Sequence, residues 1–282
     1  MHILHTVKKR GWSGETNSLL MLAAGQAARG HRVSVAAAPT SATAQRARDR
    51  ALALLAVVFD RPFHRLPVIR DGQRLLEFLR REHVDIVHCH ASFDHWVMAR
   101  LARRAGALLV RTKRNRKDIK RHPLNRWLYT QRTDATVAIS AAVRDDLRTT
   151  GFFAGAIPII ENGIDLERFH GIDRRAVRAT LGLDGPVVLY AGRITERKRV
   201  ANLLAAAALV ARQVPRLITI VAGSGDAALS AALRSQWQSE RVRFLDHRDD
   251  IPQLLTAADV LCYPARDEAF GLVPLEAMAC GC

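Results

Sequence analysis

The strongest constraint on the fold of this chain is the regular alternation of short apolar runs with longer helical patterns. Before the Asn162-Gly163 pair, strand-length apolar runs occur at residues 2–7, 32–37, 56–59, 84–88, 107–111, 135–138 and 156–160. Helical patterns occupy the intervals at 18–28, 42–52, 71–81, 93–104 and 141–149. Strands that alternate with helices predict an open, parallel, doubly wound α/β sheet with helices on both of its faces.

The turn-forming pair Asn162-Gly163 interrupts this pattern, and a second alternating series follows it. The second series predicts strands at 187–190, 217–222, 242–245 and 260–263, and helices at 174–181, 200–213, 227–237 and 250–257. A chain of 282 residues is long enough for two domains of ordinary size. We therefore predict two Rossmann-like domains, residues 1–164 and 165–282, with a small-molecule cleft between them.

The clearest chemical pattern lies in residues 264–276, directly after the last predicted strand. Glu268 falls in a predicted loop, Gly271 follows it, and Glu276 falls in the first turns of a predicted helix. In a helix, eight positions would separate the two carboxylates by about 12 Å, whereas paired glycosidase carboxylates lie ~5 to 9.5 Å apart. The N–H groups at the helix N-terminus would suit a phosphate between the two acids. The stretch favours a long ligand, although an ordinary buried strand and helix explains the spacing about as well.

Other candidate residues follow further predicted strands, and ligands of parallel sheets bind at the carboxyl ends of strands. Arg193 and Lys198 follow strand 187–190 and together suit a diphosphate, although they could equally be surface charges. The N-terminal glycines Gly11 and Gly14 are spaced G-x-x-G, unlike a dinucleotide-binding fingerprint. In the first domain, the strand-end candidates for acceptor binding are His88, His90, Arg111, Lys113 and Arg114.

The balance of 43 Lys and Arg against 27 Asp and Glu gives a formal charge of +16 and predicts an anionic partner. Residues 111–132 hold nine basic residues against one acid, with Trp127 and Tyr129 among them. This segment could be a solvated basic face or could bind an anionic membrane surface. Basic residues massed at one strand end, not spread along a groove with stacking aromatics, argue against nucleic acid.

Several classes of protein are excluded or disfavoured by what the sequence lacks. No apolar run approaches the ~18 residues of a membrane span, and the basic residues 8–10 follow the first apolar run, the reverse of the order in a secretory signal. The four cysteines have no zinc-finger spacing, and no Asp-x-Asp pattern calls for a divalent ion. We expect a cytoplasmic protein that needs no cofactor and no metal, with peripheral association at the cytoplasmic face of the membrane as an alternative location.

Four motifs in order, namely Asn162-Gly163-Ile164-Asp165, Gly192-Arg193 with Lys198, Gly223-Ser224-Gly225 and the Glu268 to Glu276 stretch, resemble the family-four retaining glycosyltransferases of GT-B fold. The resemblance covers essentially the whole chain. It implies that Arg193 and Lys198 bind the diphosphate of a nucleotide-sugar donor, that Glu268 contacts the hydroxyls of the transferred sugar, and that Glu276 contacts the ribose. The candidate catalytic residues are therefore Glu268, Arg193 and Lys198. The full set of donor-side candidates is Gly14, Asn162, Gly192, Arg193, Lys198, Gly223, Glu268, Phe270, Gly271, Leu272 and Glu276.

Two departures from the family pattern qualify this interpretation. Many relatives have a histidine after the strand that corresponds to residues 107–111, where this chain reads Arg111-Thr112-Lys113-Arg114-Asn115, so that His90 is only a speculative substitute. Relatives also continue past the Glu-Ala-Met-Ala-Cys-Gly motif, and we therefore expect the second domain to be incomplete and the activity of the chain as given to be weak.

The resulting hypothesis is a retaining, hexosyl-type transferase that moves a sugar from a nucleotide-diphosphate donor to a glycan or glycolipid acceptor. Such a reaction belongs to the synthesis of cell-envelope polysaccharide or lipopolysaccharide. The alternatives are a nucleotide-sugar epimerase of GT-B fold and a non-catalytic basic binding protein.

Overall fold

The computed structural model describes residues 1–8, 11, 13–57 and 65–282. The described chain divides into two compact units, Met1–Gly163 and Ile164–Cys282. Residues 58–59 of the strand predicted at 56–59, and Trp12 of the N-terminal glycine loop, lie outside the described residues.

The first unit is built on a six-stranded sheet in the order β3-β2-β1-β4-β5-β6, and every pair of neighbouring strands is parallel. Its strands are β1 His2–Thr6, β2 Arg32–Ala37, β3 Ala53–Ala56, β4 Ile86–Cys89, β5 Leu108–Lys113 and β6 Ala135–Ala138. Its helices are α1 Gly14–Ala28, α2 Ala42–Asp49, α3 Arg65–Arg81, α4 Ser92–Leu101, the short 3-10 helix η1 Arg103–Ala105, α5 Pro123–Gln131 and α6 Ala141–Arg148.

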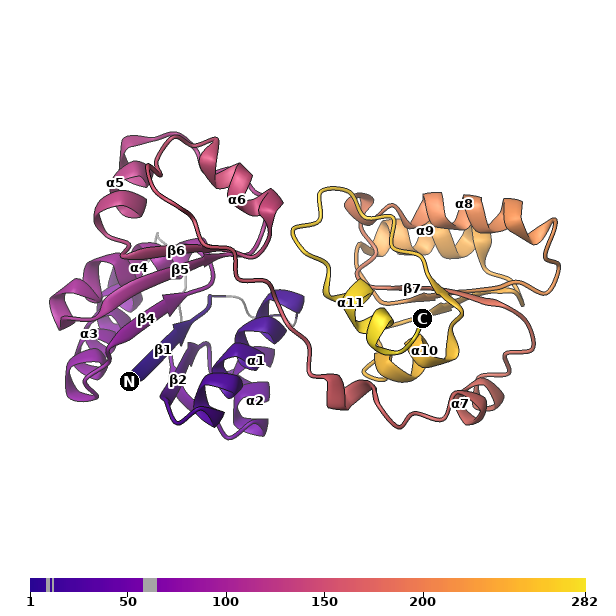
Figure 1. Ribbon diagram of the computed structural model, residues 1–282, viewed down its shortest axis with the longest axis horizontal. Helices are drawn as coiled ribbons and strands as arrows, with labels where there is room; N and C mark the ends of the chain where they lie inside the picture. Colours follow the sequence, from indigo (N-terminus) through magenta and orange to yellow (C-terminus); the bar gives the residue numbers. More distant parts are fainter. Residues whose placement is uncertain (9–10, 12, 58–64) are drawn as a thin grey trace. The chain divides into compact units, whose positions relative to one another are not determined.

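Separate apolar cores cover the two faces of this sheet (Figure 1). On one face, Leu79 of α3 and Met98 of α4 pack with strand residues such as Leu109. On the other face, Leu20 of α1 packs with Val35 of β2 and with residues of α2. A sheet with helices on both faces matches the predicted doubly wound class.

The second unit contains a four-stranded parallel sheet in the order β10-β7-β8-β9. Its strands are β7 Val187–Ala191, β8 Ile218–Ala222, β9 Val242–Leu245 and β10 Val260–Leu261. Its helices are η2 Leu166–Phe169, α7 Arg174–Thr180, η3 Glu196–Lys198, α8 Val200–Ala211, α9 Ala227–Trp237, α10 Ile251–Ala257 and α11 Leu272–Ala279.

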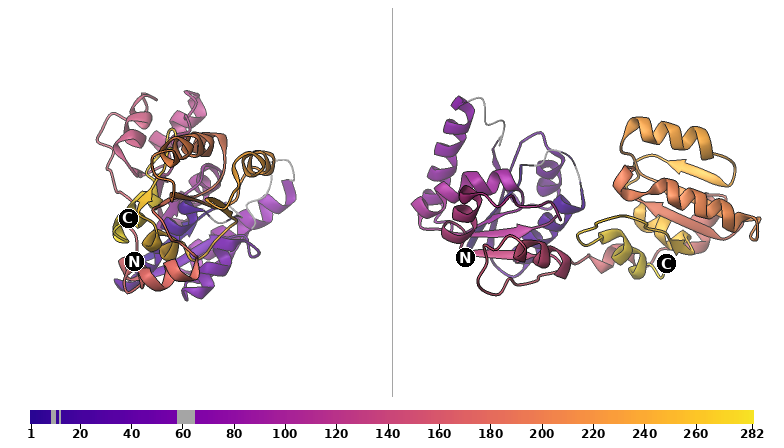
Figure 2. Two further views of the ribbon diagram at one scale, coloured as in Figure 1. Left: turned by 90° about the vertical axis from the view of Figure 1, so that its right-hand side faces the viewer. Right: turned by 90° about the horizontal axis from the view of Figure 1, so that it is seen from above.

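Alternate residues of β7 separate the two cores of the second unit. Leu189 packs with α10 and with Ala277 of α11, whereas Tyr190 packs with α8 and α9 on the opposite face. Figure 2 shows these helices from two further directions. Both units therefore confirm the predicted fold class, an α/β architecture of parallel sheets covered on both faces.

Short polar side chains begin many of the helices. The Ser13 side chain accepts the Thr16 N–H at the start of α1, and Ser140 does the same for Val143 at the start of α6. Asp226 accepts the Leu229 N–H at the start of α9. Such caps typically stabilise a helix by ~1 kcal/mol each, and each of these three begins a helix that follows the carboxyl end of a strand.

Some predicted boundaries were wrong. Residues 156–160 form only a single bridge between Ala138 and Ile159, because Pro158 has no N–H to continue a ladder. The strand predicted at 107–111 runs two residues further, so Lys113 still belongs to β5. The basic segment contains a helix, α5, which begins at Pro123 after the cap His122.

Candidate active site

Two predicted donor residues follow β7 and differ sharply in exposure. Arg193 is exposed, and its guanidinium has no hydrogen bond or ion pair with any residue in the described part of the chain. Lys198, at the end of η3, is 7% exposed. The turn between them is held by the Tyr190 hydroxyl, which donates to the carbonyl of Arg193 at 2.7 Å.

The ammonium of Lys198 meets the loop carboxylate of Glu268. Lys198 Nζ donates to Glu268 Oε2 at 2.5 Å and also to the hydroxyl of Tyr263. The Tyr263 hydroxyl lies 3.3 Å from the same carboxylate oxygen and donates to it. Burial lowers the pKa of Lys198, while burial and the charge of Glu268 raise the pKa of the Tyr263 hydroxyl. The structure thus brings together two of the three predicted catalytic residues.

The loop that carries Glu268 is tied to η3 by backbone and side-chain contacts. The N–H of Arg266 donates to the carbonyl of Arg197 at 2.8 Å, and Arg197 Nη1 donates to the carbonyl of Asp267 at 3.2 Å. Asp267 has a φ of 55° and Gly271 a φ of 85°. The loop therefore contains two left-handed positions, and glycine occupies the one that begins α11.

Glu276 lies in the helix α11, the position that the sequence predicted, and its side chain is half-buried. Burial raises the pKa of its carboxyl group, and the charge of Arg168 opposes that shift. No hydrogen bond or ion pair joins this carboxylate to a side chain among the described residues. Phe270, Gly271 and Leu272 lie between the two acids, at the loop end and first turn of the helix.

Glycines allow two strand-end loops of the second unit to touch. A Cβ on Gly223 would lie 2.0 Å from the carbonyl oxygen of Gly192, and a Cβ on Gly225 would lie 2.0 Å from that of Ile194. Ile194 N donates to the carbonyl of Ser224 at 3.1 Å. The Gly192 and Gly223 loops are thus packed backbone against backbone, which only glycine permits.

In the first unit, the predicted acceptor residues are buried within a chain of hydrogen bonds. Arg114 Nε donates to Nδ1 of His90 at 3.0 Å, and Nε2 of His90 lies 2.9 Å from Nδ1 of His5. His5 Nε2 lies 2.7 Å from the side-chain oxygen of Gln26. Because guanidinium can only donate, the proton of His90 lies on Nε2 and that of His5 on its own Nε2. At the other end, Arg114 Nη1 donates to Oδ1 of Asn162 at 2.7 Å.

The imidazoles of His90 and His5 must both be neutral to satisfy every hydrogen bond of this series. Burial, with the charges of neighbouring residues, lowers the pKa of His88 and His90 and lowers that of His5 to about 4. Nδ1 of His90 and His5 are acceptors, so a further proton on either would set two donors against each other. The three imidazoles lie close enough to hold a metal ion. The Nδ1 lone pair of His90, however, already accepts a hydrogen bond from Arg114, and that of His5 accepts one from His90.

Acid is therefore expected to destabilise the first unit. Burial also lowers the pKa of His95 to about 3, whereas burial raises that of Asp94 to about 6. Below the ordinary histidine pKa of 6.5, the unfolded chain binds protons that the folded histidines refuse, so the free energy of unfolding falls as the pH falls. Each such histidine lowers the free energy of unfolding by up to about 1.4 kcal/mol per pH unit. Asp94 acts in the opposite direction, because its carboxyl group binds a proton more readily in the folded state, and below pH 6 it offsets the effect of about one histidine.

We predict that the urea midpoint of the first unit falls steadily from pH 7 to pH 5. His95→Gln should make the free energy of unfolding depend less steeply on pH, because it removes one buried imidazole. The slope should fall by up to about 1.4 kcal/mol per pH unit, the value for one proton. His247→Gln is the matched control, since the His247 side chain is 63% exposed. A midpoint that does not change between pH 7 and pH 5, or an equal slope in wild type and His95→Gln, would contradict the prediction.

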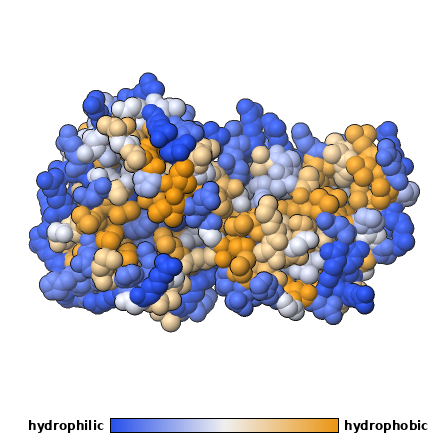
Figure 3. Space-filling view, in the orientation of Figure 1, coloured by the Kyte–Doolittle hydropathy of each residue, from blue (hydrophilic) through white to orange (hydrophobic). Residues whose placement is uncertain are grey.

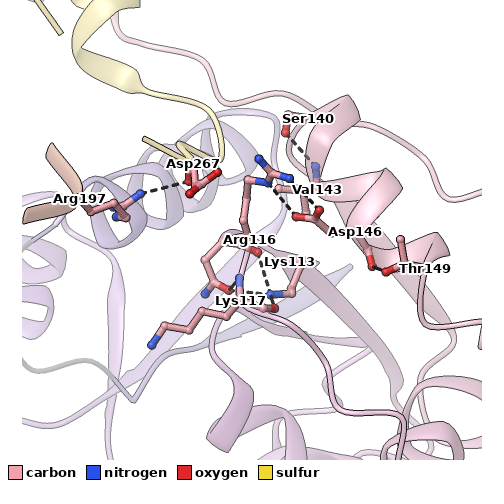
Figure 4. A network of polar contacts seen from close by, with 10 residues as sticks. Lys113, Arg116, Lys117, Ser140, Val143, Asp146, Thr149, Arg197 and Asp267 are labelled. Carbon is pink, nitrogen blue, oxygen red and sulfur yellow. Dashed lines mark hydrogen bonds and ion pairs between the residues drawn. The ribbon is translucent and has the colours of Figure 1, made fainter. Parts of the chain in front are cut away.

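Lys113 is committed to its own loop, as Figure 4 shows. Its ammonium donates to the carbonyl of Lys117 at 2.7 Å and to both oxygens of Asn115 at 2.6 and 2.7 Å. Burial lowers its pKa to about 8. Arg116 makes a two-pronged contact with Asp146, with both distances 2.9 Å. The strand-end lysine thus braces the loop that presents the exposed basic residues.

The predicted acceptor residues lie together at the carboxyl ends of β4 and β5. Their exposed fractions are 0% for His90 and Arg111, 4% for Lys113, 8% for His88 and 9% for Arg114. Arg111 donates to the carbonyl of Cys89, and His88 bonds the Thr112 hydroxyl. On the donor side, Gly14 is the first residue of α1, and Asn162 lies next to the last residue of the first unit, where it accepts a hydrogen bond from Arg114.

Three residues that contribute most to these contacts were missed in the sequence. Tyr263 closes the predicted strand directly before the loop, so its position was a usable signal. Arg197 lies beside Lys198 in the same basic run. His5 pairs in register with His88 of the neighbouring strand, but only the strand order reveals that contact.

Comparison with known proteins decides the family. Residues 12–168 match the model described as Glycosyltransferase Family 4, and residues 173–282 match the model described as Glycosyl transferases group 1. The chain belongs to glycosyltransferase family 4. The resemblance noted in the sequence is therefore confirmed at the level of the family.

Curated relatives match part of the family 4 chain. A D-inositol 3-phosphate glycosyltransferase of Mycobacterium sp. (strain KMS) is 42% identical over 136 residues, 44% of this chain and 30% of the relative. A D-inositol 3-phosphate glycosyltransferase 2 of Catenulispora acidiphila is 35% identical over 150 residues, 48% of this chain and 35% of the relative. The matched segment thus spans about a third of the length of these relatives.

Solved structures share the fold over the whole family 4 chain. Anabaena HepE in complex with UDP and glucose is 22% identical, with a TM-score of 0.81, over 100% of this chain and 79% of that chain. A glycosyltransferase from Rickettsia africae is 16% identical, with a TM-score of 0.84, over 99% and 77%. A putative UDP-N-acetylglucosamine 2-epimerase from Listeria monocytogenes is 12% identical, with a TM-score of 0.62, over 93% and 73%. Proteins named as a glycosyltransferase and as a putative epimerase therefore share this fold.

In the described part of the chain, no helix has both the length and the apolar character needed to cross a bilayer.

Proposed function

We propose that this family 4 chain transfers a sugar from a nucleotide-diphosphate donor to a glycan or glycolipid acceptor, with retention of anomeric configuration. The observation that carries the proposal is the contact between Lys198 and Glu268, which sets a buried ammonium against a half-buried carboxylate at the end of β7. Exposed Arg193 follows the same strand, and half-buried Glu276 lies in the following helix. This set of charges suits a ligand with phosphates and with hydroxyls at both ends.

The proposed roles follow from the charge that the reaction develops. As the bond from the anomeric carbon to the phosphate oxygen breaks, negative charge grows on the leaving diphosphate, and Lys198 and Arg193 stabilise it. The acceptor hydroxyl attacks the same face of the sugar, and its proton passes to the departing phosphate oxygen. Glu268 accepts hydrogen bonds from the sugar hydroxyls, and Glu276 accepts those of the ribose. No metal or cofactor is needed in this scheme.

Two neighbouring proteins bear on the choice of ligand. HepE was solved with UDP-glucose, and the curated relatives are named as glycosyltransferases that act on D-inositol 3-phosphate. The first supports a nucleotide-sugar donor for this chain, and the second supports an acceptor that carries phosphate. The epimerase alternative is favoured only by fold, whereas the family models favour transfer.

A thermal-shift screen tests the proposal. The probes are UDP-glucose, UDP-galactose, UDP-N-acetylglucosamine, ADP-glucose and GDP-mannose, together with their nucleoside diphosphates. A donor present at about 100 times its dissociation constant should stabilise the protein by ~2.7 kcal/mol. If every probe leaves the melting temperature unchanged, the donor site is wrong; if a probe binds but is epimerised and not transferred, the alternative is right.

We further propose that the basic segment 111–132 binds an anionic membrane surface on the cytoplasmic side, where a glycolipid acceptor would lie. Because Arg111, Lys113 and Arg114 are buried, the binding residues are the exposed ones from Arg116 onward. Lys117, Lys120 and Arg126 are exposed, and Leu124 of α5 is 58% exposed beside them. The ring of Trp127 in α5 stacks on that of Trp96 in α4, with a centroid distance of 6.3 Å. On the face drawn in Figure 3, hydrophilic residues cover most of both units and apolar residues form separate patches. Exposed cations with one apolar side chain suit the headgroup layer.

We predict that Lys117→Glu, Lys120→Glu and Arg126→Glu together reduce co-sedimentation with anionic vesicles by at least tenfold at low salt, since each near-surface cation contributes ~1 kcal/mol. The matched control reverses Arg100, Arg103 and Arg104, which are exposed on the same unit. Equal loss in both triple variants would indicate an effect of net charge alone, and no binding by the wild type would rule out the membrane surface.

A further inference from the structure

The carboxylate of Glu268 has three partners, and one of them is not a cation. Besides Lys198 at 2.5 Å, Oε2 of Glu268 lies 3.3 Å from the Tyr263 hydroxyl and 3.5 Å from Nη1 of Arg197. The Glu268 side chain is 27% exposed, that of Arg197 is 45% exposed, and that of Lys198 is 9% exposed. The inner partners of the carboxylate are therefore the lysine and the tyrosine.

The hydroxyl of Tyr263 links the two charged groups. It accepts a hydrogen bond from Lys198 and donates its own proton to Glu268. Because burial and the nearby carboxylate raise the pKa of the Tyr263 hydroxyl, it keeps this proton at neutral pH and remains a donor.

The ring of Tyr263 is fixed from two sides. It stacks on Tyr190 with a centroid distance of 6.2 Å and an interplanar angle of 14°. On another side lies Gly192, where a Cβ would meet the ring of Tyr263 at 3.8 Å and the hydroxyl of Tyr190 at 3.3 Å. The hydroxyl is thus held at the end of a rigid ring, whereas the Lys198 ammonium ends a flexible side chain.

This difference matters once a donor binds. A diphosphate that takes the ammonium of Lys198 removes the strongest partner of Glu268 and leaves a half-buried carboxylate. Tyr263 cannot follow the phosphate, because its ring is packed, so its hydroxyl stays with Glu268. The remaining acceptor capacity of the carboxylate is then open to a hydroxyl of the sugar.

We propose that Tyr263 is a positioning residue that keeps the Glu268 carboxylate in place when Lys198 turns to the donor diphosphate, so that the sugar is recognised as well as the nucleotide. This inference rests on the proposed function, because it assumes that Lys198 and Glu268 bind a nucleotide sugar. It adds a reason why the complete donor should bind more tightly than its nucleoside diphosphate, since only the complete donor gives Glu268 a new partner in exchange for Lys198.

Tyr263→Phe tests the role, since it removes the hydroxyl and keeps the stacked ring. The measurement is the ratio of two dissociation constants, that of UDP over that of UDP-glucose, by titration calorimetry; if another donor of the screen binds more tightly, the ratio is measured with that donor and its diphosphate. In the wild type the ratio should exceed one. In Tyr263→Phe it should fall by roughly tenfold, the size of one hydrogen bond to a charged group, while UDP itself binds as before.

Two further variants make the result specific. Arg266→Ala is the matched control, because Arg266 lies in the same loop but contacts Asp267 at 3.2 Å and not Glu268; its ratio should stay at the wild-type value. In a Glu268→Gln background, Tyr263→Phe should change the ratio far less, because the tyrosine acts through the carboxylate.

The outcomes separate the two proposals. An unchanged ratio in Tyr263→Phe, or an equal loss of affinity for UDP and UDP-glucose, would overturn the role of Tyr263 and leave the proposed function standing. A full effect of Tyr263→Phe in the Glu268→Gln background would also overturn it. If the wild type binds no donor and no diphosphate of the screen, the proposed function fails and this inference fails with it.

Discussion

Lys198→Ala is expected to weaken the binding of UDP by about a hundredfold, the scale for removing one partner of a buried charge pair, while uridine binding changes little. Lys198 is 7% exposed, and its ammonium contacts Glu268 and the hydroxyl of Tyr263. A phosphate that replaces Glu268 as its partner would be poorly hydrated there, so the charge–charge attraction is weakly screened. Uridine has no phosphate and gains nothing from the lysine.

Two comparisons give this prediction its control. Arg212→Ala removes one exposed positive charge from the same unit, at the C-terminal end of α8, and should leave UDP affinity within about twofold. Arg193→Ala should lie between the two variants, because its guanidinium is exposed and screened. Calorimetric titration of each variant with UDP and with uridine decides the matter. A uridine affinity that drops as far as the UDP affinity would mean that the lysine supports the loop and does not bind phosphate.

The sequence predicted the parts of this structure that depend on local periodicity. The alternation of strands and helices, the loop position of Glu268 and the helical position of Glu276 all follow from apolar spacing and turn residues. Lys198 and Glu268 were assigned to one site because both follow strands of one sheet. Parallel strands bring their carboxyl ends to a common edge, so that inference needed no contact information.

The rest depends on strand order and on the direction of side chains, which local patterns do not encode. His5 contacts His90 because β1 lies beside β4, where His5 is paired in register with His88, two residues before His90. Lys113 was expected to face a ligand, yet its ammonium finds three acceptors within its own loop. Tyr263 was treated as part of a strand, because nothing local indicates which polar group its hydroxyl meets.

The largest effect on stability is expected from Gly225→Ala. The new Cβ would lie 2.0 Å from the carbonyl oxygen of Ile194 and 2.7 Å from two further backbone atoms of that residue. Ile194 cannot withdraw easily, because its side chain is 1% exposed in the core between β7 and α8, and its carbonyl accepts the N–H of Asp226 at 2.9 Å. Overpacking against such fixed atoms costs about 3 kcal/mol or more.

Urea unfolding of the second unit measures this cost, and Gly155→Ala is the control. Gly155 lies in the first unit, a Cβ there would meet nothing within 4 Å, and its backbone lies outside the left-handed region, so Gly155→Ala should leave the urea midpoint of the second unit at the wild-type value. Any Gly225→Ala protein that folds should also bind UDP weakly, because a loop forced away from Ile194 displaces the turn that carries Arg193. If Gly225→Ala unfolds at the wild-type urea concentration, then the backbone of Gly225 is not in contact with that of Ile194, and this prediction is wrong.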